Sequence, residues 1–434
     1  MELDMLGIIV LVSSFTFFLV IGTPIAYSIG LSAMATMLVS FDVLPAFSTM
    51  AQRMATGLES FSLLAIPFFI LAGQLMNSGG IAMRLIEFAK VLVGRLPGGL
   101  ALVNVTANML FGAISGSAAA SASAIGTIMG PRMKEEGYDK SFSAAINVTS
   151  ATTGLSIPPS NILIVYALAS GGTSIAALFL ARYVPGILTG LAIMLVGSIY
   201  AYRKKYPVGD KIPFKDGVKK FFDAIPSLMM LVVVIGGIIA GIFTATEAAA
   251  IAVVYSLVLA LIYKEITFKH LPQIIINTVR TAGMVLLLIA ASIGLSWVMS
   301  FENIPETVSK ALLSLSSDPF VILLIINLAL LAVGIFMDMT PAVLIFTPIF
   351  LPIVTTQLGL DPIHFGIIMI LNLNVGLVTP PVGAVLFIGC SVAKLKIQDL
   401  VKPLIPFYIA MFVVLLLVTF IPEISLWVPE FFGY

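Results

Sequence analysis

The 434-residue chain is short of charge. Lys, Arg, Asp and Glu together make up 10% of it, whereas about 25% is usual for a soluble domain. Apolar residues make up 60%, and the mean hydropathy is +1.14. Burial in a soluble fold could not hide this much apolar surface, so lipid must solvate much of the chain. The net charge of +1 also argues against nucleic-acid binding.

Cysteine and histidine are scarce too, which excludes several chemistries. Cys390 is the only cysteine and lies in an apolar run, so we expect a small buried side chain and no internal disulfide. His270 and His364 are far apart and lack the spacing of a zinc motif, so no transition-metal site is predicted. No phosphate-binding P-loop occurs. The acidic start, residues 1–4, does not resemble a signal peptide, so the first apolar run predicts a permanent helix.

Apolar runs of about 20 residues predict membrane-spanning helices. Two longer regions, 98–172 and 319–393, are apolar but interrupted by Gly, Pro, Ser and Thr. Amphipathic stretches at 81–96 and 303–316 precede them and predict interfacial helices. The simple spans are expected near 5–22, 24–40, 61–78, 176–201, 226–243, 247–263, 273–300 and 403–425.

An internal repeat is the most informative pattern in the sequence. A shift of 222 residues superimposes seven residues, mostly Gly and Pro, and chance matches between apolar segments would give one or two. The sequence therefore predicts a duplication. The superimposed residues are Gly112 on Gly334, Gly137 on Gly359, Asp139 on Asp361, Gly154-Leu155 on Gly376-Leu377, and Pro158-Pro159 on Pro380-Pro381.

Basic residues predict opposite orientations for the two copies. The loop 202–222 is rich in lysine and is therefore placed in the cytoplasm, together with the basic segments 132–140 and 394–402. The loop 354–362, which matches 132–140 in the repeat, has no Lys or Arg and falls outside. Only three basic residues remain on the side predicted to be exterior. Both chain termini are expected on that side too. Those three cations are Arg53, Arg182 and Lys310.

The predicted organisation has three parts. The first repeat, 1–201, contains a re-entrant hairpin at 98–131 and a broken helix at 141–170. The second repeat, 223–434, contains a hairpin at 319–354 and a broken helix at 363–393, and 202–222 is a basic cytoplasmic linker. Inverted repeats with discontinuous helices are typical of secondary transporters.

Proline explains why the broken helices favour a binding site. A Pro-Pro pair in mid-membrane frees backbone carbonyls, which are tolerated there only within protein or beside a cavity. Neutral oxygens suit a sodium ion, and the start of the following half-helix suits an anion. A simple kink or close helix packing would explain one such break, but two breaks at equivalent positions favour a site.

Asp338 is the strongest single candidate, because a carboxylate at mid-membrane costs about 2.5–3.5 kcal/mol on insertion scales and usually has a function. It also stands where it can cap the returning half of its hairpin. Glu247 follows Thr244 at a predicted helix start, where capping explains it.

These residues closely resemble the large membrane subunit of the tripartite ATP-independent periplasmic (TRAP) transporters, over essentially the whole chain. The resemblance implies an all-α, inverted-repeat, elevator-type carrier of the ion-transporter superfamily in the bacterial inner membrane. It also implies a separate small membrane subunit of four helices and a periplasmic substrate-binding protein. The motifs behind it are Ser115-Gly116-Ser117, the break 154–161, Met337-Asp338-Met339-Thr340-Pro341 and Thr379-Pro380-Pro381-Val382-Gly383.

The resemblance also implies site residues, with sodium as the coupling ion and no other cofactor. Asp338, Thr340, Ser156 and Ser160 would face the substrate. The role of Asp338 stays open between supporting sodium and accepting substrate hydroxyls. One sodium site would use Ser115, Ser117, Gly154, Ile157 and Pro159, and the second Met337, Met339, Gly376, Thr379 and Pro381.

The predicted function is sodium-coupled uptake of an organic acid, a sialic acid or a C4-dicarboxylate, without enzymatic activity. A stand-alone carboxylate transporter is the alternative within the same class. An intramembrane serine protease is the alternative of another class, because Ala113-Ile114-Ser115-Gly116 nearly matches the G-x-S-G motif of rhomboid proteases. That chemistry needs a base beside the serine, and neither histidine is clearly placed to supply it.

Overall fold

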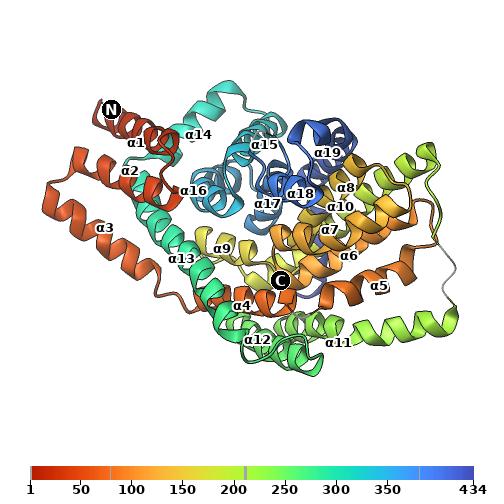
Figure 1. The fold of residues 1–434 in the computed structure, drawn as a ribbon. Helices are drawn as coiled ribbons and strands as arrows, with labels where there is room; N and C mark the ends of the chain where they lie inside the picture. Colours follow the sequence, from red (N-terminus) through yellow and green to blue (C-terminus); the bar gives the residue numbers. More distant parts are fainter. Residues whose placement is uncertain (1, 79, 210–212, 381) are drawn as a thin grey trace.

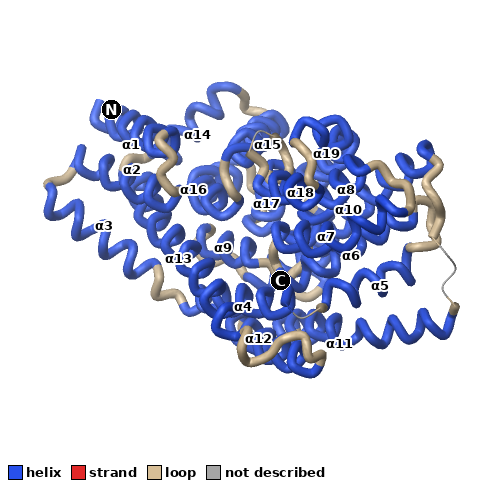
Figure 2. The backbone as a smooth tube through the Cα atoms, in the orientation of Figure 1, coloured by secondary structure: helices blue, strands red, loops and turns tan. Residues whose placement is uncertain are grey.

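The structure is a computed structural model that describes residues 2–78, 80–209, 213–380 and 382–434. Within these ranges every element of regular secondary structure is a helix, joined by loops, and there is no strand (Figure 2). Seven of the described helices are long and apolar enough to cross a membrane, or eight if one bent pair counts as a single span. This confirms a multi-pass helical membrane protein.

The described residues form twenty α-helices, one short 3₁₀ helix and one short π-helix (Figure 1). The first half contains α1 (Glu2–Val20), α2 (Ile25–Ser40), α3 (Val43–Gly57), η1 (Phe61–Leu64), α4 (Ala65–Ser78), α5 (Ile81–Val93), α6 (Gly99–Ser115), α7 (Ala118–Glu135), α8 (Lys140–Leu155), α9 (Asn161–Ala169) and α10 (Ile175–Lys204). The second half contains α11 (Phe214–Ile239), α12 (Ala245–Ile262), α13 (Leu271–Phe301), α14 (Ile304–Leu315), α15 (Pro319–Phe336), α16 (Met339–Pro352), η2 (Ile353–Gln357), α17 (Pro362–Gly376), α18 (Ala384–Ala393), α19 (Ile397–Phe420) and α20 (Glu423–Phe431).

The helices pack as two groups. The frame group consists of α1–α4 and α11–α13, in which α4 packs on α12 and α13 packs on α2, α3 and α4. The hairpin group consists of α6–α10 and α15–α20, in which α6 packs on α8, α15 on α17, and α10 on α19 and α20. The amphipathic helices α5 and α14 contact both groups. The boundary between the groups therefore passes beside the interrupted helices.

Four helices differ from the sequence-based expectation. Helix α11 begins at Phe214 rather than near 226, so much of the predicted linker 202–222 is helical. Its first turns are polar on one side and pack on α5, which a search for apolar runs misses. Helix α19 likewise begins at Ile397 rather than 403, and α3 and α20 were not predicted at all because both are short and mixed in polarity.

The two halves present their helices in the same order. A shift of 222 residues places α2 near α12, α6 near α15, α8 near α17 and α10 near α19. The bent pair of α3 with η1 and α4, which turns by 65°, corresponds to the single long helix α13. This order is what a duplication requires. The opposite orientation of the halves and the domain limits stay predictions.

Candidate functional site

The tips of both hairpins meet at one cavity, which we call the central cavity. It has a volume of about 300 Å³ and is lined from the frame group by α4 and α13 and from the hairpin group by α6, α7, α9, α16 and α18. It therefore lies at the boundary between the groups. Its polar lining residues are Gln74, Asn77, Ser115, Ser117, Asn161, Thr281, Asp338 and Thr340.

The first hairpin turns sharply because Gly116 adopts a left-handed conformation, with φ of 61°, directly after α6. The Ser117 hydroxyl caps the returning helix α7 by accepting a hydrogen bond from the amide of Ala120 at 3.2 Å. The Ser115 hydroxyl donates to the Ser117 carbonyl at 3.5 Å. A Cβ atom added at Gly116 would lie 3.7 Å from the Pro159 carbonyl oxygen, so the first hairpin tip touches the first break.

The first break exposes unpaired oxygens. Helix α8 ends at Leu155 and α9 begins at Asn161, as the Gly and Pro pattern predicted. Within the described part of the chain, the carbonyls of residues 157–159 accept no hydrogen bond. The buried side-chain oxygens Ser160 Oγ and Asn161 Oδ1 have no partner either. This set of neutral oxygens fits a hard monovalent cation such as sodium.

Ser156 occupies a different environment from the one expected. It is fully buried and does not line the central cavity. Its hydroxyl oxygen lies 3.0 Å from Arg182 Nη2 and 2.9 Å from Asn374 Nδ2, and both groups donate to it. Its oxygen is therefore already occupied by protein donors, and this residue joins the first break to α10 and α17.

Arg182 lies in the interior of the hairpin group, and its predicted place toward the exterior side of the membrane stays a prediction. Its side chain is wholly buried in α10, where its second hydrogen bond goes to the Ile367 carbonyl at 3.1 Å. No carboxylate forms an ion pair with it among the described residues. Hydropathy alone could not separate a surface arginine from a buried one, because its contacts come from α8 and α17.

The second hairpin places a carboxylate in the central cavity. Helix α15 ends at Phe336, and Asp338 occupies the N-cap position of α16. Asp338 lies deep inside the molecule, yet its side chain is open to the cavity. Asp338 is the only charged residue among the described residues that line the cavity.

The second break differs from the first. Helix α17 ends at Gly376 and α18 begins at Ala384. The Leu377 carbonyl accepts the amide of Val385 at 3.2 Å, and the Val378 carbonyl accepts the hydroxyl of Tyr408 at 2.6 Å. This loop therefore satisfies carbonyls that the first break leaves free. Pro381, proposed as a ligand in this loop, lies outside the described residues.

Glycines let the interrupted helices approach closely. A Cβ atom added at Gly112 in α6 would come within 2.2 Å of the Gly154 Cα atom in α8. In the second half, a Cβ atom added at Gly376 would come within 2.5 Å of the Gly334 carbonyl carbon. These are residues that the 222-residue shift superimposes, so the backbone contact beside each break is equivalent in the two halves.

Four helices begin at the central cavity, and the partial positive charges at their first turns contribute to its electrostatic potential. The first residues of α7, α9, α16 and α18 all line it, namely Ala118, Asn161, Met339 and Ala384. The N-terminus of a helix exposes free N–H groups and a partial positive charge. No lysine or arginine is among the described lining residues. The helix starts therefore favour an anion, whereas the Asp338 carboxylate, the only charged side chain among the described lining residues, opposes one.

The predicted site residues separate into two sets. Ser115, Ser117, Asp338, Met339 and Thr340 line the central cavity together. The remaining described candidates surround the breaks without lining it. Those residues are Gly154, Ser156, Ile157, Pro159, Ser160, Met337, Gly376 and Thr379. The cavity also contains Gln74, Asn77 and Thr281, which the sequence did not single out because they belong to ordinary helices of the frame group.

The histidines do not support catalysis at Ser115. His364 is buried with its Nδ1 atom 2.6 Å from the Ser425 hydroxyl, and His270 is exposed before α13; neither lines the central cavity. The protease alternative therefore lacks its base. Glu247 forms a capping box with Thr244, as expected, and Cys390 is buried. The described residues contain no group of three or more His, Cys, Asp and Glu that would hold a metal ion.

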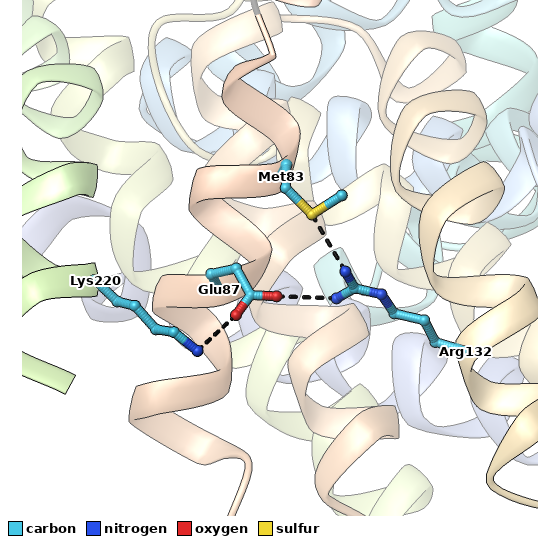
Figure 3. A network of polar contacts seen from close by, with 4 residues as sticks. All are labelled: Met83, Glu87, Arg132 and Lys220. Atoms are coloured by element: carbon cyan, nitrogen blue, oxygen red, sulfur yellow. Dashed lines mark hydrogen bonds and ion pairs between the residues drawn. The ribbon is translucent and has the colours of Figure 1, made fainter. Parts of the chain in front are cut away.

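An ion-pair network lies at the end of the molecule predicted to be cytoplasmic. Glu87 of α5 accepts a hydrogen bond from Arg132 of α7 at 3.0 Å and from Lys220 of α11 at 2.7 Å (Figure 3). Burial raises the pKa of Glu87, but these two cations outweigh burial and leave the pKa below its ordinary value. One carboxylate thus joins the hairpin group to the frame group.

Comparison with known proteins identifies the family. A sequence model described as "Tripartite ATP-independent periplasmic transporter, DctM component" matches residues 12–424. The chain is 56% identical to the uncharacterized protein YgiK of Salmonella typhimurium, over 98% of each chain. It is 42% identical to the isethionate TRAP transporter permease protein DctMQ of Oleidesulfovibrio alaskensis, covering 98% of this chain and 66% of that one.

A third relative carries the same family name, and a solved structure shares the fold. The C4-dicarboxylate TRAP transporter large permease protein DctM of Pseudomonas aeruginosa is 39% identical over 94% of each chain. The YdaH transporter of Alcanivorax borkumensis shares the fold, with a TM-score of 0.63 and 14% identity over 86% of this chain and 87% of that one. The relatives with a functional name are permeases, not enzymes, which confirms the expectation of a non-enzymatic protein.

Proposed function

Because the chain belongs to the family of the DctM component of tripartite ATP-independent periplasmic transporters, we propose that it carries a small organic anion into the cell with sodium. The supporting observation is the central cavity, where four helices begin and both hairpin tips meet at the boundary between two helix groups. Such a place suits a ligand that must be released on either side of a membrane.

The substrate would be held by dipoles and neutral polar groups. The helix starts supply N–H groups for a carboxylate or sulfonate, and Thr340, Asn77 and Thr281 supply hydrogen bonds to its other polar atoms. Asp338 would accept hydroxyl groups of the substrate or stabilise a nearby sodium ion. The relatives named for isethionate and C4-dicarboxylate make a small hydroxylated or doubly charged acid the favoured class.

Sodium would bind first at the break between α8 and α9. The free carbonyls of residues 157–159 and the unpaired oxygens of Ser160 and Asn161 favour this break over the second. Sodium would supply positive charge beside the cavity, and the chain would supply neutral oxygens around it. The contacts in the second break leave fewer free oxygens, which makes Thr379 and its neighbours the weaker sodium candidates.

Transport would proceed by an elevator motion of the hairpin group against the frame group. The cavity is lined by both groups, so sliding one along the other would change which side of the membrane it opens to. Helix α15 is apolar and long enough to span a membrane, and so is α16 together with η2. Their lengths therefore do not decide whether the second hairpin crosses the membrane or turns back within it.

Two partners complete the proposal. A small membrane subunit would be the first; this chain covers 66% of the longer DctMQ relative. A periplasmic binding protein would deliver the substrate, as the family description implies. The inner membrane is the corresponding location, with both termini outside.

Uptake into proteoliposomes tests the proposal. The vesicles would contain this chain and its small subunit, with the binding protein and labelled isethionate, succinate or N-acetylneuraminate added outside. An inward sodium gradient would be compared with potassium alone. Uptake that needs sodium and the binding protein is expected for one of these acids. Uptake of an acid without the binding protein would favour a stand-alone carboxylate transporter, and uptake without sodium would contradict the assignment of the first break.

A further inference from the structure

A second cavity opens where the frame and hairpin groups meet, nearer the end of the molecule predicted to face outward. We call it the outer cavity; it has a volume of about 470 Å³ and is bounded by α3, α9, α13 and α16. In Figure 1, α13 passes between α3 and the pair formed by α9 and α16, and the contacts between these helices agree. The outer cavity is thus a separate space from the central cavity.

Arg53 is the only charged residue among the described residues that line the outer cavity. Its guanidinium carbon lies 5.5 Å from the centre of the Trp297 ring, a cation–π contact that limits where the side chain can go. No ion pair joins Arg53 to an acidic side chain within the described residues. The positive charge is therefore positioned by an aromatic ring but not neutralised.

Hydroxyl groups line the same cavity as this arginine. Thr56, Ser296 and Ser300 line the same cavity, and Ser292 lines it with a hydroxyl that is buried and has no hydrogen-bond partner. Buried hydroxyls without partners are uncommon in proteins, because leaving one unpaired is costly. A ligand that brings both a negative charge and hydrogen-bonding oxygens would satisfy Arg53 and Ser292 together.

The two cavities share their walls. Helix α13 lines the central cavity with Thr281 and Val285 and the outer cavity with residues 292–300. Helices α9 and α16 also line both cavities. An anion moving along this boundary would therefore pass from a site with a cationic side chain to one that has none among its described lining residues.

We propose that the outer cavity is a recruitment site for the transported organic anion, in which Arg53 binds the carboxylate or sulfonate group. This inference rests on the proposed function, because it assumes that the transported solute is an anion. A cationic side chain near the outer surface raises the local anion concentration and speeds capture. The central cavity, which offers helix dipoles and neutral polar groups but no cationic side chain among its described lining residues, would bind the anion less tightly and release it more readily.

Trp297 offers a direct test of binding. The chain has two tryptophans, so W427F leaves Trp297 as the reporter beside Arg53. The full-length W427F protein in lipid nanodiscs would be titrated with isethionate, succinate and N-acetylneuraminate at constant ionic strength maintained by sodium chloride. We expect a saturable fluorescence change for at least one acid. R53Q should raise its dissociation constant about tenfold, the scale of one charge-assisted hydrogen bond, and R53K should restore part of the binding.

Lys310 supplies the matched control, because K310Q removes another cation predicted to be exterior, one that pairs with Glu306 on α14 away from the outer cavity. It should leave the titration unchanged. A lack of saturable change with all three acids, or an equal dissociation constant in R53Q, would overturn the recruitment site.

Uptake separates this inference from the proposed function. In proteoliposomes, R53Q should raise KM about tenfold and leave the maximal rate within about twofold, because the central cavity is intact. Sodium-dependent uptake with an unchanged KM in R53Q would refute the outer site and leave the proposed function standing. A saturable Trp297 response in a wild-type protein that transports none of the acids would support the outer site and count against the proposed function.

Discussion

At the scale of single residues, charge is placed sparingly within the hairpin group. Arg182 is buried without a carboxylate partner and is held by Ser156 and the Ile367 carbonyl, while Asp338 faces the central cavity. Burying an arginine is costly unless its donors are satisfied. The two hydrogen bonds of Arg182, to Ser156 directly after α8 and to Ile367 in α17, tie α10 to the first break and to α17, while its buried Nε atom has no partner among the described residues.

Asp338 should be essential for uptake. We expect D338N to lower the initial uptake rate at least about tenfold, because a charge-assisted hydrogen bond contributes about 1.5–3 kcal/mol. Insertion and thermal stability should stay close to wild type, since asparagine also suits an N-cap.

The matched control for this prediction is D361N. Asp361 caps α17 by accepting the amide of Ile363 at 2.6 Å and does not line the cavity. This variant should transport normally. Normal uptake by D338N as well would remove Asp338 from the site.

At the scale of helices, the contact of α6 with α8 depends on Gly112 and Gly154. We expect G112A to destabilise the protein by about 1–3 kcal/mol, the usual cost of forcing extra atoms into a close contact, because its Cβ atom would meet the Gly154 Cα atom at 2.2 Å. Thermal melting in detergent measures this loss.

Gly130 of α7 is the control for this contact, since a Cβ atom added there would have no neighbour within 4 Å. G130A should be neutral or slightly stabilising, because alanine is the better helix former. Equal melting temperatures for G112A and wild type would show that α6 and α8 separate without cost.

Glu87 should make the stability of the helix arrangement depend on pH. Its pKa in the folded protein is lower than its ordinary value of 4.5. The stabilisation is therefore fully present above the unfolded pKa and is lost as the pH falls through the folded pKa. We expect E87Q to melt at a lower temperature than wild type at pH 7, and the difference to vanish well below pH 4.5. A difference that persists in acid would mean that packing, not charge, explains the effect.

At the scale of the whole molecule, an elevator motion requires the hairpin group to slide along the frame group. Arg132 of α7 and Lys220 of α11 bind the same carboxylate (Figure 3), so cysteines at these two positions can be joined by a short bifunctional thiol reagent. In a C390S background, cross-linked R132C/K220C protein should lose uptake and regain it when a cleavable linker is cut.

The control joins two positions within the hairpin group, namely D139C and K204C, whose native side chains lie 3.6 Å apart. Cross-linking that pair should leave uptake unchanged. Continued uptake by fully cross-linked R132C/K220C would argue against relative motion of α7 and α11.

Much of the site follows from local sequence. The turn at Gly116, the breaks after Leu155 and Gly376, and the position of Asp338 all depend on residues whose effect is confined to a few neighbours, such as glycine, proline and helix caps. The apolar runs near 176–201, 226–243, 247–263, 273–300 and 403–425 likewise placed helices that are long and apolar enough to span a membrane, because transfer into lipid depends on local composition. The runs near 5–22 and 24–40 form shorter apolar helices, and the run near 61–78 belongs to a bent pair.

Long-range contacts decided the rest. Ser156 was expected to face the substrate, but donors from α10 and α17 occupy its hydroxyl. The second break was expected to free its carbonyls, but Tyr408 and Val385 satisfy two of them. The sequence by itself determined a helical membrane protein with two interrupted helices and a carboxylate at the turn of the second hairpin. Only the tertiary structure decided which oxygens stay free of hydrogen bonds, because some hydrogen-bond partners in this fold are more than 200 residues apart in the sequence.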